Sequence, residues 1–274
     1  MDPLPRRRWA EMTTADFAAV DPERWLAVLL VAAIEQHGPH LPLVVDAAIN
    51  QGILDRALAR APAALPVTAL PAMPAGRSEE HLAFPGTLTV RAETLRRMWY
   101  ELGASVARAG VRKLLIFNSH GGQVQVMQIV ARRLRVDHGM FVAAVSWPQL
   151  GLPDGLIDAA ERRHGIHAGL VETSLMLALH PELVRMEAAA DFTPLTARAE
   201  ADFPILMGLG PAGFGWQAQD LHPAGAAGDA RTADAATGRA ILDHVAARLV
   251  ALFEEMVRFP LANLKDGPGS PDAG

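Results

Sequence analysis

The fold is decided by the apolar run LAVLLVAAI, residues 26–34, which is followed directly by the polar sequence EQHGPH, residues 35–40. Nine uncharged residues rich in Leu and Val are typical of a parallel strand that is buried on both faces. The run therefore indicates an α/β protein. Open α/β sheets bind ligands at the carboxyl ends of their strands, so the polar residues from Glu35 onward lie where a functional site is expected.

The rest of the chain alternates between helix-like and strand-like patterns. We expect further strands at residues 65–73, 113–117 and 140–147, and helices at residues 46–61, 91–109, 124–136, from about 170 to 180, and 232–259. Residues 148–165 are predicted to be irregular, and residues 187–230, rich in Ala, Gly and Pro, to form a long loop or cover. This pattern predicts one domain over residues 1–264 and a disordered tail over residues 265–274.

Composition excludes several classes of protein. With 274 residues, 50% of them hydrophobic, the chain can bury a large core. The formal net charge is −5 and the only basic cluster is Arg6–Arg8, so no nucleic-acid partner is expected. The chain has no cysteine, so any metal must be held by His and carboxylates. No apolar run suggests a secretory signal or a membrane span, and we expect a cytoplasmic protein without a membrane partner.

Metal-binding residue types gather after two of the predicted strands. Glu35, His37 and Asp46 follow the first strand, and His120 follows the strand at residues 113–117. Two divalent ions sharing Asp46, with Glu35 and His120 on one ion and His37 on the other, would lower the pKa of a bridging water and polarise a carbonyl oxygen. Amide hydrolysis needs both effects.

Proton transfer to a departing nitrogen needs a further group, and His167 and Glu172 are candidates. They are five residues apart, about 140° around an ideal helix, so they share a pocket only if His167 precedes the helix. Gly121 and Gly122, after His120, would let the backbone approach an ion or a substrate closely.

Each of these residues also has a structural interpretation. Asp46 alone is most simply a helix N-cap, and His120 could belong to a turn. As a group, however, the charged residues after the first strand would lack partners at the end of a buried strand unless they bind something. Purely structural roles are favoured for several others: packing for Trp147 and Trp216, a turn and N-cap for Gly228 and Asp229, and surface or loop positions for His164, His222 and His244.

Four blocks of sequence resemble the creatininase (creatinine amidohydrolase) family. They are EQHGPHLP at residues 35–42 with Asp46, SEEH at 78–81 with FPGT at 84–87, NSHGG at 118–122, and HAG at 167–169 with ETS at 172–174. Their order and spacing cover residues 26 to 240, which is most of the chain.

The resemblance implies a three-layer α/β/α fold with a mostly parallel sheet, two divalent metal ions (zinc, manganese or iron), and commonly a homo-oligomer, a hexamer in many members. By matched position the metal ligands would be Glu35, His37, Asp46 and His120, with Asp46 bridging. His167 would be the catalytic imidazole, and Glu172 a catalytic carboxylate or an additional ligand. The candidate substrate contacts are Ser78, Gly121, Gly122 and, as the alternative to a packing role, Trp147.

The chain departs from creatininase proper after His120. Creatininase proper has an aromatic residue and then an acidic ligand there, whereas this chain has Gly121 and Gly122. The second metal therefore lacks one expected carboxylate, which Glu172 or water would have to replace. The only tyrosine is Tyr100, on a predicted helix, which argues against creatinine as the substrate.

We therefore predict a metal-dependent amidohydrolase that acts on an amide, lactam or formamide C–N bond of a small molecule or short peptide. One alternative within the family is a peptidase of the type that cleaves the mycofactocin precursor. Two others are a metal-dependent enzyme that is not a hydrolase, and a binding protein on the same scaffold. Serine hydrolase and P-loop motifs are absent from the sequence.

Overall fold

A parallel four-stranded sheet forms the centre of the molecule. The computed structural model describes residues 4, 6–206, 208–209 and 212–267. The strands are β1 (Leu26–Val31), β2 (Val67–Ala69), β3 (Lys113–Asn118) and β4 (Phe141–Ser146), in the spatial order β2-β1-β3-β4. All three strand pairings are parallel, so the carboxyl ends of the strands lie at one edge of the sheet.

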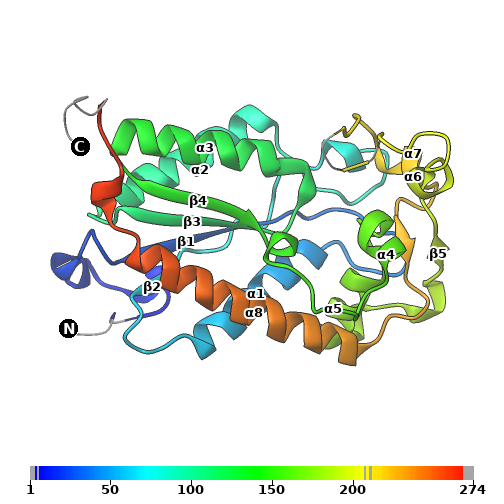
Figure 1. Ribbon diagram of the computed structural model, residues 1–274, viewed down its shortest axis with the longest axis horizontal. Helices are drawn as coiled ribbons and strands as arrows, with labels where there is room; N and C mark the ends of the chain where they lie inside the picture. Colours follow the sequence, from blue (N-terminus) through cyan, green and yellow to red (C-terminus); the bar gives the residue numbers. More distant parts are fainter. Residues whose placement is uncertain (1–3, 5, 207, 210–211, 268–274) are drawn as a thin grey trace.

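Helices cover both faces of this sheet, which gives the three-layer α/β/α architecture (Figure 1). On one face lie α1 (Val45–Arg60), α5 (Leu170–Leu179) and α8 (Ala235–Arg258), and on the other α2 (Ala92–Arg108) and α3 (Val124–His138). None of the helices in the described part of the chain combines the length and the apolar character that crossing a bilayer requires.

The alternation of side chains along each strand explains the two cores. Leu26, Val28 and Leu30 of β1 pack with the α1, α5 and α8 side, whereas Ala27 and Leu29 pack with the α2 and α3 side. Successive side chains of a strand point to opposite faces, so a strand covered on both faces must be apolar throughout. The predicted α/β fold with a parallel sheet is confirmed.

The element boundaries differ most at strand ends. The first strand ends at Val31 rather than at residue 34, and the second covers only Val67–Ala69 of the predicted 65–73. Beyond β1 the chain still pairs with other segments. The Ala32 N–H donates to the carbonyl of Met73, and Ile34 forms an isolated β-bridge with Leu88. The predicted strands were therefore too long: Ala32 and Ala33 after β1 stay buried, whereas Pro71 and Ala72 after β2 are exposed.

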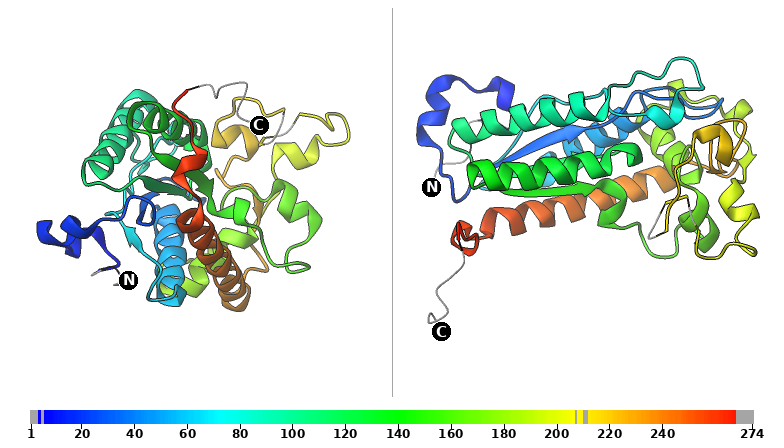
Figure 2. Two further views of the ribbon diagram at one scale, coloured as in Figure 1. Left: turned by 60° about the vertical axis from the view of Figure 1, so that its left-hand side comes forward. Right: turned by 90° about the horizontal axis from the view of Figure 1, so that it is seen from above.

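Two stretches predicted to lack regular structure contain short elements. Residues 148–165 include α4 (Ala159–His164), and residues 187–230 include β5 (Asp191–Phe192), α6 (Leu195–Arg198), α7 (Ala218–Leu221) and β6 (Gly228–Asp229). The strands β5 and β6 pair antiparallel. These elements gather beyond the carboxyl ends of the sheet strands (Figures 1 and 2). They therefore enclose the edge at which ligands of α/β sheets bind.

Part of the predicted disordered tail, residues 268–274, lies outside the described residues. The start of that tail, Lys265, contacts α3, because its backbone carbonyl accepts a hydrogen bond of 2.7 Å from Arg135.

Candidate metal centre

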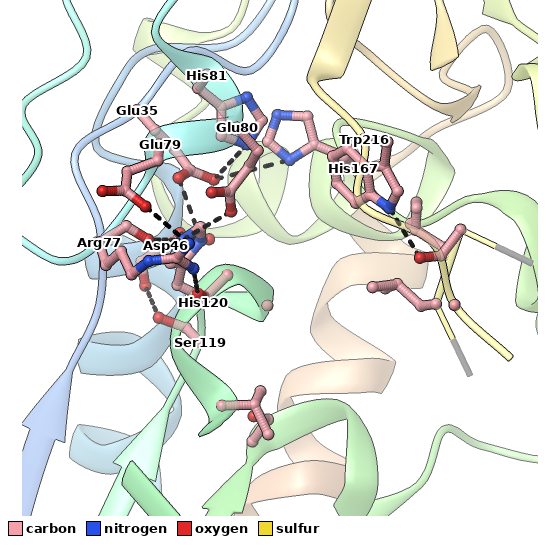
Figure 3. A pocket seen from close by; sticks show the side chains of 18 of the residues that line it. Glu35, Asp46, Arg77, Glu79, Glu80, His81, Ser119, His120, His167 and Trp216 are labelled. Carbon is pink, nitrogen blue, oxygen red and sulfur yellow. Dashed lines mark hydrogen bonds and ion pairs between the residues drawn. The ribbon is translucent and has the colours of Figure 1, made fainter. Parts of the chain in front are cut away.

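Four side chains predicted to be metal ligands converge at the carboxyl edge of the sheet. Glu35 and His37 lie on the loop after β1, Asp46 is in the first turn of α1, and His120 follows β3. The Nδ1 atom of His120 lies 3.1 Å from Glu35 Oε2 and 3.3 Å from Asp46 Oδ2. The other oxygen of Asp46, Oδ1, lies 3.6 Å from His37 Nε2. Asp46 thus stands between the two imidazoles, where a bridging carboxylate would be. Figure 3 shows the part of this site that contains Glu35, Asp46 and His120.

Backbone carbonyls orient both of these imidazoles. His37 Nδ1 lies 3.0 Å from the carbonyl oxygen of Glu35, and His120 Nε2 lies 2.7 Å from that of Arg77. A carbonyl oxygen only accepts hydrogen bonds, so each of these nitrogens carries the hydrogen. The other ring nitrogen, Nε2 of His37 and Nδ1 of His120, faces the carboxylates and is the one that could bind a metal ion in place of a proton.

Several polar atoms of the site are buried without a hydrogen bond. Within the described residues, Glu35 Oε2, Asp46 Oδ2 and His37 Nε2 have no hydrogen-bond partner. The exposed fractions of Glu35, His37 and Asp46 are only 1%, 0% and 2%. Because a buried polar atom without a partner destabilises the fold, these atoms fit a site that holds cations.

The carboxylates also favour positive charge on the imidazoles. Burial opposes this, but contact with Asp46 and attraction from Glu172 raise the pKa of His37 to about 9. Burial also lowers the pKa of His120, but the carboxylates of Glu35 and Asp46 raise it more. The pKa of His120 therefore lies well above its ordinary value. A divalent ion would compete with protons for the same nitrogens, which is characteristic of metal sites.

His167 and Glu172 reach the same site from the start of α5 and the residues just before it. His167 precedes that helix, as sharing a pocket with Glu172 requires, and its backbone pairs with Ala227. Its Nε2 atom donates to the Gln36 carbonyl at 2.8 Å, so Nδ1 is unprotonated and lies 3.9 Å from Glu35 Oε1. Burial, reinforced by neighbouring His37, lowers the pKa of His167 well below its ordinary value. The imidazole is therefore neutral at neutral pH.

The Glu172 carboxylate lies on the His37 side of the site. Its Oε2 atom accepts a 2.6 Å hydrogen bond from Ala168 N–H and lies 3.8 Å from His37 Nε2. Burial raises the pKa of Glu172 to about 7. Ligand atoms of His37, Asp46 and Glu172 all lie within 4.8 Å of one another, so these three residues could hold one ion.

The residues expected to contact substrate occupy different positions. Gly121, Gly122 and Trp147 line a cavity of about 1450 Å³ that also reaches Glu35 and His167. Ser78 is fully buried instead, with its hydroxyl 3.4 Å from His120 Nε2. Trp147 is only 3% exposed and packs in the core, as the packing interpretation expects, while also forming part of the cavity wall.

Glu80 and His81 belong to the site but were given no role from the sequence. They lie on the short 3-10 helix Glu79–His81. His81 Nδ1 accepts a 2.7 Å hydrogen bond from the side-chain amide of Gln36, and Nε2 lies 3.3 Å from Glu35 Oε1. Glu80 Oε1 lies 3.3 Å from His120 Nε2. The signal that could have found them is the unusual SEEH sequence itself, two acids and an imidazole in one short block.

His40, the second imidazole of the EQHGPH sequence, points away from the centre. Its Nε2 atom lies 2.9 Å from the Thr173 hydroxyl, and its ring stacks on Phe192 with centroids 5.4 Å apart. It therefore links the loop after β1 to α5 and β5.

Comparisons with known proteins agree with this geometry. The family model described as "Creatininase: Creatinine amidohydrolase" matches residues 10–253. The chain is 34% identical over 228 residues to a mycofactocin precursor peptide peptidase of Mycobacterium ulcerans, covering 80% of this chain and 81% of that protein. It is 28% identical over 198 residues to a creatinine amidohydrolase of Pseudomonas putida, covering 65% and 73%.

Solved structures show the same architecture. A crystal structure of creatinine amidohydrolase (creatininase) superposes with a TM-score of 0.72 and 26% identity, covering 92% of this chain and 98% of that one. A putative creatinine amidohydrolase from Bacteroides fragilis gives a TM-score of 0.74 at 22% identity, covering 95% and 99%. The family match over most of the chain and the identity to these relatives show that this chain belongs to the creatininase family.

Proposed function

We propose that this chain is a metal-dependent amidohydrolase that hydrolyses a C–N bond at the centre formed by Glu35, His37, Asp46 and His120. The observation that carries this proposal is the set of buried ligand atoms without a hydrogen-bond partner, on Glu35, Asp46 and His37. The unpartnered oxygens of Glu35 and Asp46 both lie close to His120 Nδ1, and His37 Nε2 lies 3.6 Å from the other oxygen of Asp46. Two solved creatininase structures are described as a manganese form and, for a mutant, as a Zn-Zn form, which supports ions of this kind.

Two divalent ions bound here would lower the pKa of a water molecule and polarise the carbonyl of the substrate. The ligand sets would be Glu35 and His120 for one ion and His37 and Glu172 for the other, with Asp46 shared. His81 holds Glu35 in place through the contact between Nε2 and Oε1.

His167 is the residue that would transfer the proton from water to the departing nitrogen. Because its imidazole is neutral and its Nδ1 is bare, His167 must accept a proton before it can donate one. It would take a proton at Nδ1 from the attacking water and return it to the departing nitrogen. The carbonyl of Gln36 fixes the ring orientation during both steps.

A short peptide is the second candidate for the substrate, and two observations favour it. The relative with 34% identity is named as a peptidase, and the creatinine amidohydrolase has 28% identity. In addition, the cavity of about 1450 Å³ is larger than the roughly 300–1,000 Å³ that is usual for small-ligand pockets.

The test is to purify the protein without added metal, measure its metal content, and assay formamides, small lactams and short peptides. We expect bound divalent metal and release of an amine or amino acid from one of these classes. Asp46→Ala should lose both the metal and turnover, because the shared carboxylate is removed. Full activity in Asp46→Ala, or a wild-type protein that binds no divalent metal, would contradict the proposal.

A further inference from the structure

Gly122 leaves room for a side chain from another part of the chain. A Cβ atom added at Gly122 would overlap Glu80 Oε1 and lie 2.6 Å from His120 Nε2. At neighbouring Gly121 an added Cβ would meet no atom within 4 Å. The space beside residue 122 is therefore taken by one particular group, the carboxylate of Glu80.

Glu80 points into the centre, whereas its neighbour Glu79 does not (Figure 3). Glu79 forms an ion pair of 2.7 Å with Arg77, and its side chain is 43% exposed. The Glu80 side chain is only 11% exposed, and ligand atoms of Glu80, Glu35 and His120 all lie within 4.8 Å of one another. The 3-10 helix thus places one acid outside the site and one inside it.

The charge balance of the site also favours a fourth carboxylate, that of Glu80. Two divalent ions carry four positive charges, and Glu35, Asp46 and Glu172 supply three negative ones. With Glu80 included, four carboxylates face two ions, which balances the charge of a buried site.

We propose that Glu80 is a metal ligand, and that its carboxylate occupies the space that an acidic side chain at position 122, as in creatininase proper, would need. It would bind the ion held by Glu35 and His120, while Glu172 serves the ion held by His37. The inference rests on the proposed function, since it presumes a metal centre. Independent support comes from the oxygens of Glu35 and Asp46 that face His120 and have no hydrogen-bond partner.

The first test compares metal binding by the wild-type protein, Glu80→Gln and the matched control Glu79→Gln. Metal content is measured by elemental analysis, and affinity by competition with a chromogenic chelator for Zn²⁺. We expect two ions in the wild type and in Glu79→Gln. Glu80→Gln should lose one ion or bind it at least ten times more weakly. Two ions bound to Glu80→Gln with wild-type affinity would overturn the inference.

The second test moves the carboxylate back to position 122. Glu80→Gly should lose an ion, and the double variant Glu80→Gly with Gly122→Glu should regain it, because removing Glu80 frees the space that the new side chain needs. Gly122→Glu alone should bind metal poorly, since two carboxylates would then compete for one space. A folded double variant that binds no more metal than Glu80→Gly would overturn the inference.

The two tests separate this inference from the proposed function. A wild-type protein without divalent metal contradicts the metal centre as a whole. A wild-type protein with two ions, together with a Glu80→Gln protein that keeps both, contradicts only the role of Glu80. If Glu80→Gln does not fold, the double variant decides: two ions support the inference and fewer contradict it.

Discussion

At the residue scale, the chemistry of the site is set by which nitrogen of each imidazole carries a proton. Three backbone carbonyls, those of Glu35, Gln36 and Arg77, each accept from one ring nitrogen of a site histidine. The second nitrogen faces a carboxylate, and in His37 and His120 it is the one at which a metal ion would replace a proton. Rigid acceptors of this kind fix the tautomer before any ligand arrives, which is how residues around metal sites orient the ligands themselves.

His167 is expected to act in catalysis without being needed for metal binding. We predict that His167→Ala keeps the wild-type metal content and loses turnover by roughly 10²–10⁴-fold, which is typical for removal of a general acid–base group. Metal analysis and steady-state kinetics on the same preparation check this. Loss of metal in His167→Ala would instead make this imidazole a ligand.

His40 should make the stability of the fold depend on pH. Burial, with repulsion from His37, lowers the pKa of His40 to about 4, whereas an unfolded histidine has a pKa of about 6.5. Between these values the unfolded chain binds a proton at this position that the folded chain does not. The contribution of His40 to stability is therefore fully present above pH 6.5 and is lost as the pH falls towards 4, by at most about 1.4 kcal/mol per pH unit.

Urea unfolding of the wild type and of His40→Gln between pH 4 and 7 measures this contribution. The free energy of unfolding of the wild type should fall more steeply with decreasing pH than that of the variant. Parallel curves would show that His40 is not the group responsible.

The sequence predicted that four candidate metal ligands would meet, and the structure brings them together, but no role was predicted for Glu80 and His81, which lie at the same site. Glu35, His37 and Asp46 are close in the chain, and His120 follows a neighbouring strand, so strand patterns alone predict that they meet. Glu80 and His81 instead reach the centre from the segment after β2, through a path that depends on how the loop between β2 and α2 folds back. That path has no periodic pattern, and no residue of it follows a recognisable strand end.

At the element scale, the central strands and long helices could be predicted from the sequence. Their buried apolar residues recur at the spacing that is typical of a strand or a helix. Ile49, Ile53, Leu54 and Leu58 are all buried on α1, as the helical spacing indicates. The short helix α4 could not be predicted in this way, because its place depends on contacts with distant segments rather than on an apolar stripe. Its first turn is capped by Asp158, which accepts from Glu161 N–H at 2.8 Å.

Glu161, on α4, contacts both α5 and β6 through its carboxylate. Its carboxylate accepts hydrogen bonds from Leu170 N–H at 2.8 Å, at the start of α5, and from Asp229 N–H at 3.0 Å, in β6. Backbone atoms of Gly165, Gly169 and Gly228 crowd around it, with no room for a Cβ. This buried carboxylate therefore holds together the segment from which His167 projects.

We predict that Glu161→Ala lowers the free energy of unfolding by about 2–3 kcal/mol, because two backbone N–H groups lose their acceptor. Turnover should also fall, since His167 loses its support, while metal content is kept. Chemical denaturation and metal analysis check this, with exposed Glu187→Ala as the control. A Glu161→Ala protein as stable as the Glu187→Ala protein would contradict this role.

At the scale of the whole molecule, the sheet, its helices and the cover of short elements form one scaffold around a single centre. The ligands come from segments more than eighty residues apart, Glu35 and His120 among them, so bound ions would cross-link distant parts of the chain. Anything that binds only the folded state stabilises it, by about 2.7 kcal/mol when its concentration is 100 times its dissociation constant.

Removal of metal should therefore lower thermal stability. We predict that treatment with EDTA lowers the melting temperature by several degrees, and that Zn²⁺ or Mn²⁺ restores it. Differential scanning calorimetry measures the change, with Asp46→Ala as the control that responds to neither treatment. An unchanged melting temperature in the wild type would show that the centre holds no ion tightly.

If acidic and imidazole groups from separate strand ends hold two metal ions, an anomalous difference map should locate both. The map is calculated from crystals of the wild-type protein, with data collected at the absorption edge of its native metal. We expect two peaks, one among Glu35, Asp46 and His120 and the other among His37, Asp46 and Glu172. A map without peaks between these side chains, from protein that retains its activity, would show that these residues do not hold the ions.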